Sequence, residues 1–231
     1  MTYTDPRSYL YQSGLLDPDA AQRITRDALK ACDDGELYLQ YSASESFGFD
    51  DGRLKMADYS TGSGFGLRGV AGEMTAFAHA NDLSHAAIAR AADTIKVVRD
   101  GHGGTMAMPP MPTNARRYTD ANPLAGVDFS AKVALMQQID AAARARDPRV
   151  VQVSVTLAAS WSVVEIVRAD GFLATDVRPL VRLSVNIVCE QNGRRETGSF
   201  GIGGRRLYDD LFQPETWNRA IDEALAQALT N

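Results

Sequence analysis

Hydrophobic residues recur at helical spacing in four stretches of the chain. The first begins at Asp17-Pro18, an N-cap residue followed by proline at the first helical position, and continues to about Cys32. Apolar positions three and four residues apart mark the others, at about 83–98, at 129–146 and after Pro214. The pattern predicts four amphipathic helices.

Strict alternation of apolar and polar residues marks the clearest strands, at 151–157 and 181–187. Such alternation is typical of antiparallel sheets with one buried and one polar face. Shorter strands separated by Asp-Gly and Gly-Glu turn signals are expected at 36–42, 46–52, 53–59, 64–70 and 74–80.

The order of these elements predicts an α+β protein with two similar lobes. Each lobe, 1–99 and 127–231, would hold a mostly antiparallel sheet of about five strands and two helices. Residues 100–126 are rich in Gly, Pro and Met and are expected to form a linker. Arg68 and Arg182 each lie on a long strand before a tight turn, so an internal duplication is a hypothesis.

The composition of the chain limits the classes of protein to which it can belong. The chain has 231 residues, of which 45% are hydrophobic and 23% charged, which is typical of a globular protein. A net charge of -5 argues against direct binding to nucleic acid or anionic membranes. We find no signal peptide or membrane-spanning run, and Cys32 and Cys189 form no motif, so a cytoplasmic location without a disulfide is expected.

One glycine-rich stretch matches a nucleotide-binding fingerprint. Gly64, Gly66 and Gly69 fit G-x-G-x-x-G, but no buried strand precedes them and no helical pattern follows. We therefore interpret them as glycines in a strand that another part of the backbone approaches closely.

Several blocks resemble one protein family. "GFGLRGVAGEMTAFAHANDL", "DVRPLVRLSV" and "QNGRRETGSFGIGGR" are similar to the N-terminal region of the TldD branch of the TldD/PmbA family. Its members are called modulators of DNA gyrase and resemble zinc metallopeptidases. The resemblance implies action on extended or unfolded peptides, zinc in the full-length protein, and a dimer with a TldE/PmbA-like chain or a second copy.

The chain departs from the family pattern at the metal site. The family motif HExxxH is missing, and the three histidines, His79, His85 and His102, are not spaced for a zinc peptidase. We therefore expect no catalytic or metal-binding residue in this chain, and an active enzyme only in a longer protein with a further catalytic domain after residue 231. The alternative is a non-catalytic binding protein that regulates a partner such as DNA gyrase.

Polar residues on the predicted strands are the candidate contacts for a substrate or partner. They are Arg68, Arg178, Arg182, Ser184, Asn186 and Arg205. The arginines could hold a carboxylate with two hydrogen bonds, or could pair with nearby acidic residues and serve only the fold. The strand 181–188 could also accept an extended peptide along a free edge. The glycine-rich segment 198–206 is expected to be a loop or a turn into the last helix.

Overall fold

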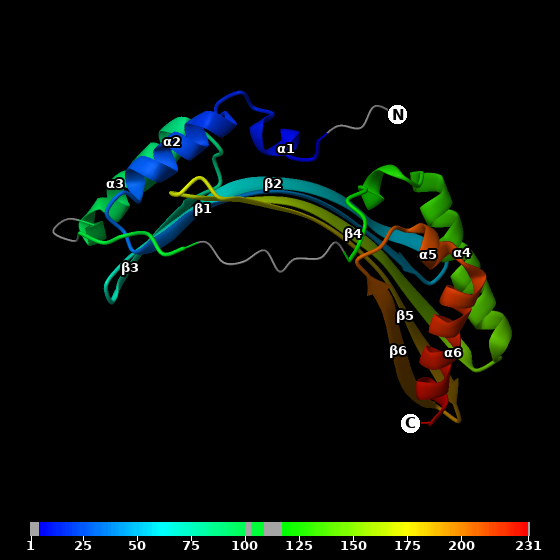
Figure 1. Ribbon diagram of the computed structural model, residues 1–231. Helices are drawn as coiled ribbons and strands as arrows, with labels where there is room; N and C mark the ends of the chain where they lie inside the picture. The colour runs from blue at the N-terminus through cyan, green and yellow to red at the C-terminus, as the bar shows by residue number, and fades with distance from the viewer. Residues whose placement is uncertain (1–4, 100–102, 109–116, 231) are drawn as a thin grey trace. The chain divides into compact units, whose positions relative to one another are not determined.

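The computed structural model describes residues 5–99, 103–108 and 117–230. The protein is α+β, with a six-stranded antiparallel sheet in the order β3-β2-β1-β4-β5-β6 (Figure 1). The strands are β1 (Asp34–Asp50), β2 (Arg53–Ala71), β3 (Met74–Ala80), β4 (Val150–Arg168), β5 (Leu173–Gln191) and β6 (Arg194–Gly204). The helices are α1 (Ser8–Tyr11), α2 (Pro18–Ala28), α3 (His85–Arg99), α4 (Phe129–Arg146), α5 (Asp209–Phe212) and α6 (Pro214–Thr230), with a 3-10 turn, η1, at Pro123–Ala125.

The predicted α+β class is confirmed, but the strands are fewer and longer than expected. In the described residues, each half of the chain has three consecutive strands between two long helices, with a further short helix (α1 or α5), instead of about five strands. The expected breaks near 43–45 and 60–63 are absent because these Ser-rich segments continue β1 and β2. Their side chains have no apolar alternation, so hydrogen bonding to the neighbouring strand keeps them extended.

The chain divides into two compact units that share the long strands. Unit 1 contains Met1–Ser42, Thr61–Arg116 and Ser162–Val177, and unit 2 contains Ala43–Ser60, Arg117–Trp161 and Arg178–Asn231. Each unit takes strand segments from both predicted lobes. The boundaries 1–99, 100–126 and 127–231 therefore stay a prediction.

In unit 1, helices α2 and α3 lie side by side, and α3 packs on β3 (Figure 1). Asp17 caps α2 by accepting a hydrogen bond from the Ala20 amide at 2.7 Å, as the N-cap prediction required. The core between helices and strands includes Ala21, Leu29, Leu37, Leu39, Leu67, Ile88 and Ile95.

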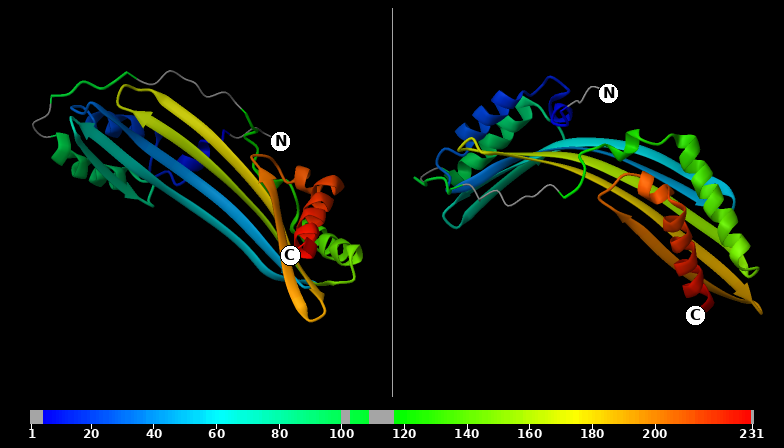
Figure 2. Two further views of the ribbon diagram at one scale, coloured as in Figure 1. Left: turned by 90° about the horizontal axis from the view of Figure 1, so that it is seen from below. Right: turned by 45° about the vertical axis from the view of Figure 1, so that its right-hand side comes forward.

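In unit 2, helices α4 and α6 pack against each other, and α6 lies on β6 (Figure 2). The buried core includes Met136, Ile139, Val155, Leu157, Leu183, Val185 and Ile221. Trp161 and Trp217 are buried, as predicted. Beneath α4, Lys132 forms a buried ion pair with Glu45 at 2.5 Å. The helices therefore cover the apolar side of these strands and leave the alternate, polar positions on the other face.

The turn signals are confirmed by backbone angles. Asp51 and Gly52 have φ of 46° and 75°, and Asn192 and Gly193 have φ of 53° and 77°. Two successive residues with positive φ form the hairpin turn that matches the twist of antiparallel strands.

The glycines of the fingerprint lie within β2, and the next element is strand β3 instead of a helix. A Cβ at Gly64 would come within 2.7 Å of the Ala80 carbonyl oxygen, which confirms the predicted close approach of another backbone. A Cβ at Gly66 would meet the Phe77 ring at 2.9 Å. The segment expected to be a loop at 198–206 is mostly strand β6, so that prediction was wrong.

The predicted linker at 100–126 lies partly outside the described residues. Within the described part, the Ala107 amide donates to the Asp33 carbonyl at 2.6 Å, and η1 is capped by the Asn122 side chain. The segment 103–108 is thus hydrogen-bonded to the residue before β1, although its composition is that of a linker.

Candidate functional site

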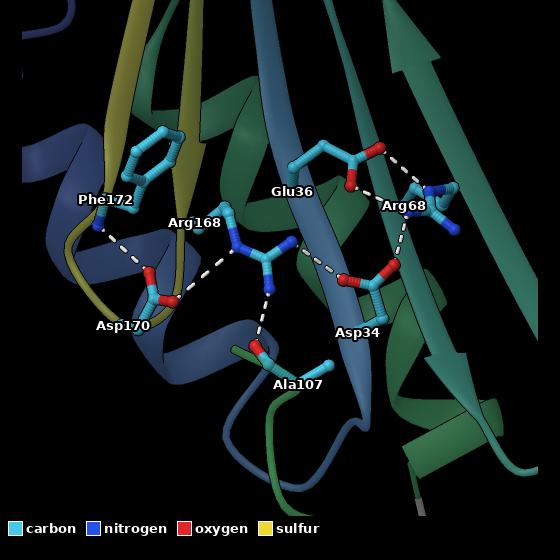
Figure 3. A network of polar contacts seen from close by, with 7 residues as sticks. All are labelled: Asp34, Glu36, Arg68, Ala107, Arg168, Asp170 and Phe172. Carbon is cyan, nitrogen blue, oxygen red and sulfur yellow. Dashed lines mark hydrogen bonds and ion pairs between the residues drawn. The ribbon is translucent and has the colours of Figure 1, made fainter. Parts of the chain in front are cut away.

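In unit 1, Arg68 is held by two carboxylates of the neighbouring strand β1. Its Nε and Nη2 donate to the two Glu36 carboxylate oxygens, each at 2.8 Å, and Nη2 also donates to Asp34 at 2.7 Å (Figure 3). The bidentate hydrogen bonds to Glu36 are the main reason that the pKa of Arg68 is raised.

A second arginine completes this network. Arg168 on β4 is 9% exposed, and its Nη1 donates to Asp34 at 2.8 Å while Nη2 donates to the Ala107 carbonyl at 2.9 Å (Figure 3). Asp170, in the turn after β4, lies 3.6 Å from Nε. Partial burial raises the pKa of Asp34, but the hydrogen bonds from Arg68 and Arg168 outweigh this and hold its pKa below the ordinary value.

These contacts favour a structural role for Arg68. Its Nε and Nη2 groups already donate to carboxylates of its own unit, so a ligand carboxylate could bind this edge of the guanidinium only by displacing Glu36. The sequence left open that Arg68 pairs with an acidic residue nearby in the chain. The real partners, Asp34 and Glu36, lie 34 and 32 residues earlier in the chain.

In unit 2, Arg182 is placed very differently. It is exposed on β5, and its Nε donates to the Ser184 hydroxyl at 3.1 Å. Among the described residues, no carboxylate pairs with Arg182. Its guanidinium lies over Gly201 of β6, where an added Cβ would come within 2.4 Å of Nη2.

Arg182 borders a hollow of about 360 Å³ on this face of unit 2. Its lining includes Ser44, Ser46, Asp58, Ser60 and Ser160. The Ser44 and Ser60 hydroxyls are 2.9 Å apart and hydrogen-bonded to each other. The serine hydroxyls, Arg182 and two carboxylates give this otherwise largely apolar hollow some donors and acceptors for a peptide backbone and its polar side chains. The carboxylates are Asp58 and Glu45, and Glu45 is already paired with Lys132.

Ser184 and Asn186 lie on the same face of β5 as Arg182. They are opposite Gly201 and Ser199 of β6 and alternate with the buried Val185. Sequence reasoning thus grouped three residues that the sheet does bring to one face. Their role in binding stays a prediction.

The expected free edge at 181–188 was wrong. The whole stretch is paired with β6, from Val181 opposite Gly204 to Val188 opposite Thr197, and β4 lies on its other side. Its backbone donors and acceptors are therefore used within the sheet, and any ligand of this face must be held by side chains.

The remaining two candidate arginines do not join this face. Arg178 is half-buried on β5 and has an interaction partner. Arg205 follows the last strand, and its guanidinium carbon lies 5.2 Å from the centre of the Tyr118 ring. Asp58 and the serines of the hollow were missed by sequence reasoning, because exposed Ser and Asp give no signal until the strands are aligned.

The described residues contain no group of three or more His, Cys, Asp or Glu side chains that could hold a metal ion. His79 stacks on Phe77 with ring centres 5.6 Å apart, and His85 lies at the start of α3. His102 lies outside the described residues. The described residues therefore do not offer the ligand set of a catalytic zinc.

Two further features bear on the sequence predictions. Cys32 and Cys189 are buried and form no disulfide. None of the described helices combines the length and the apolar character needed to cross a membrane.

The structure thus defines an α+β protein in which helices cover one side of the strands of unit 2 and polar groups occupy the other. Models of PmbA/TldA metallopeptidase domain 1 and of its central domain match residues 35–101 and 122–231. The chain therefore belongs to the TldD/PmbA family.

Curated relatives and solved structures agree with this assignment. The chain is 37% identical over 206 residues to a metalloprotease TldD homolog of Haemophilus influenzae, covering 86% of this chain and 43% of the relative. A metalloprotease TldD homolog of Buchnera aphidicola is 35% identical over 206 residues, which again cover 86% of this chain and 43% of the relative. The chain spans about half the length of the curated relatives it matches.

The solved structures show the fold alone, because their sequences are distant. A protein from Bacteroides thetaiotaomicron, described as a modulator of DNA gyrase, has a TM-score of 0.70 at 17% identity, covering 90% of this chain and 49% of that chain. TldE from Thermococcus kodakarensis has a TM-score of 0.60 at 14% identity, with coverage of 88% and 46%.

Proposed function

We propose that this chain is the substrate- and partner-contacting portion of a TldD-like zinc metallopeptidase that acts on extended or unfolded peptides. In this proposal the metal and the catalytic groups belong to a longer protein, and a TldE/PmbA-like chain or a second copy is the partner. The naming of the relatives as metalloproteases TldD supports the reaction class.

One observation carries the assignment of a role to this chain. Arg182 presents an exposed guanidinium above Gly201, at the border of a hollow whose lining includes several serines, with no carboxylate partner in the described residues. Because an unpaired guanidinium can hold a carboxylate with two parallel hydrogen bonds, this face suits an acidic group of a peptide or of a partner chain.

The polar face also suits a protease with little sequence preference. Ser44, Ser60 and Ser184 carry hydroxyls that both donate and accept, so they can bond to backbone amides and carbonyls of any residue. Arg182 would then fix the position of the chain through a charged group. Chemistry on the peptide bond would be left to the metal-bearing part of the protein.

The proposal is tested in the longer protein that contains these residues. We expect Arg182→Ala to keep the metal content and the melting temperature, and to lower peptide cleavage or partner affinity at least about tenfold, because a desolvated charged pair typically costs 2–5 kcal/mol when one partner is truncated. The matched control is Arg206→Ala, an exposed arginine that already has Asp210 at 3.6 Å.

Wild-type cleavage and partner binding in Arg182→Ala would remove this face from the site. A reading frame without HExxxH after residue 231, together with unaltered binding to a partner such as DNA gyrase, would instead support the regulatory alternative.

A further inference from the structure

One side of strand β2 has a free backbone edge within unit 1. Strand β3 pairs only with the last part of β2, from Phe65 opposite Ala80 to Ala71 opposite Met74, and β1 occupies the other side. In the described part of the chain, no strand pairs with 61–64 on the β3 side. Alternate residues of an edge strand direct their N–H and C=O groups outward, so this segment offers unpaired donors and acceptors.

This edge lacks the charged residues and prolines that usually block strand addition. Natural edge strands carry charged residues, prolines or bulges that prevent pairing with another chain. Thr61, Gly62, Ser63 and Gly64 are small and uncharged, and the first three are exposed. A Cβ at Gly62 would meet only the Ser42 hydroxyl, at 3.6 Å. At Gly64 the chain after β3 comes close, because an added Cβ would lie 2.7 Å from the Ala80 carbonyl oxygen and 3.3 Å from the Asn81 Cα. An approaching backbone therefore meets no bulky side chain along 61–63 and reaches the chain after β3 at Gly64.

A groove adjoins the free edge and would enclose a bound strand. Its volume is about 1130 Å³, and its lining includes Thr61–Gly64 together with Tyr38, Gln40, Phe77, His79 and Asn81. Phe77 is 61% exposed, and its ring stacks on His79 and lies next to the bare backbone of Gly66. Exposed aromatic rings in fixed positions are typical of binding surfaces.

The groove is close to neutral. Glu36 is the one carboxylate among its described lining residues, and both of its oxygens accept hydrogen bonds from Arg68. The amide side chains of Gln40 and Asn81 can donate and accept. A strongly charged ligand would thus find no free counter-ion here, whereas a neutral segment with regularly spaced amides would.

We propose that this edge and groove bind an extended, uncharged segment of an unfolded polypeptide as an added β-strand. Only a polypeptide places alternating donors and acceptors at the spacing of a strand edge, and residues 61–64 span about 13 Å, enough for about four peptide residues. That this segment belongs to a substrate rests on the proposed function. The site itself is independent of Arg182.

The test is hydrogen exchange on the purified 231-residue chain with the probe acetyl-Thr-Val-Thr-Val-Thr-Val-Thr-amide. We expect the outward amides of 61–64 to exchange fast in the free chain and at least about tenfold more slowly with saturating probe, because strand addition converts them into ladder hydrogen bonds. Exchange in 74–80 and 194–204, which include the other two strand edges, should not change.

Three results would overturn the proposal: no slowing at 61–64, slowing at 74–80 or 194–204 instead, or slow exchange already in the free chain. The last result would mean that another segment or a second copy covers the edge.

A pair of variants tests the groove. Phe77→Ala should weaken the affinity for a fluorescein-labelled form of the probe about three- to tenfold, since an aromatic wall contributes on the order of 1 kcal/mol beyond its buried area. The control Tyr59→Ala removes another exposed aromatic side chain, 66% exposed and outside the groove, and should leave the affinity unchanged. Equal loss in both variants would contradict the site.

Arg182→Ala separates this inference from the proposed function. The probe has no carboxylate, so its affinity should not depend on Arg182. If Arg182→Ala leaves peptide cleavage intact, the role proposed for Arg182 is refuted. If the probe still binds to that variant, the strand-addition site is retained.

Discussion

Arg68 and Arg182 occupy the middle strands of the two three-stranded halves, yet their surroundings are opposite. Beside Arg68, strand β1 presents Asp34 and Glu36, and three hydrogen bonds hold the guanidinium. Beside Arg182, strand β6 presents Gly201, and the guanidinium lies over bare backbone. The neighbouring strand, more than the arginine itself, decides whether the charge stabilises the fold or remains available for a ligand.

The two faces of β6 differ in the same way: α6 covers one face, and the other is open. The largest loss of stability is expected from a substitution on the face covered by α6. A Cβ at Gly198 would lie 2.0 Å from the Ala224 carbonyl oxygen and 2.5 Å from the Ala228 amide, both backbone atoms of α6. Gly198→Ala should therefore lower the free energy of unfolding by about 3 kcal/mol, since the helix has to move. Denaturant unfolding measures this, and a wild-type value would mean that α6 does not pack so closely on β6.

The Arg68 network should show the next largest effect. Asp34→Ala removes the carboxylate shared by Arg68 and the largely buried Arg168, and should cost about 2 kcal/mol of unfolding free energy. The control is Asp58→Ala, an exposed carboxylate that forms no ion pair with any described residue, and it should change stability by less than about 0.5 kcal/mol. An equal loss of unfolding free energy in the two variants would contradict the structural role of the Arg68 network.

Acid should weaken the same network. The pKa of Asp34 is lower in the folded protein than the unfolded value of about 3.9, so its contribution is present above that value and lost as the pH falls through the folded pKa. The stability difference between wild type and Asp34→Asn should be complete above about pH 5 and shrink below about pH 4. A difference that stays constant down to pH 2 would contradict this assignment.

The smallest effect on stability is expected at Gly201. A Cβ there meets the far end of the flexible Arg182 side chain, at 2.4 Å from Nη2, so the guanidinium moves and the fold does not. Gly201→Ala should leave the melting temperature within about 1 °C while lowering peptide or partner affinity severalfold. A large loss of stability would show that the open face is as tightly packed as the helix-covered face.

Much of the fold could be predicted from local pattern. Apolar spacing gave helix 129–146 with the observed ends, and the turns at Asp51-Gly52 and Asn192-Gly193 followed from residues that tolerate positive φ. The length of β1 and β2 could not be predicted, since the Ser-rich segments carry no apolar alternation and become strand only through their neighbours.

From the sequence, the residues of the candidate site could be listed, but the strands and side chains that lie next to them could not. Alternation placed Arg182, Ser184 and Asn186 on one polar face, which the sheet confirms. The partners of Arg68 and the pairing of 181–188 with β6 depend on which strands are neighbours. The sequence contains no local signal for strand order, so the expected free edge was assigned to the wrong strand.

The most direct test of the contrast between the two arginines is one paired measurement on Arg68→Ala and Arg182→Ala. Each variant is assayed for its melting temperature and for its affinity for an extended peptide that carries one carboxylate. We expect Arg68→Ala to melt lower and bind like wild type, and Arg182→Ala to melt like wild type and bind at least about tenfold more weakly. Unchanged affinity in Arg182→Ala, or weakened affinity in Arg68→Ala, would contradict the account.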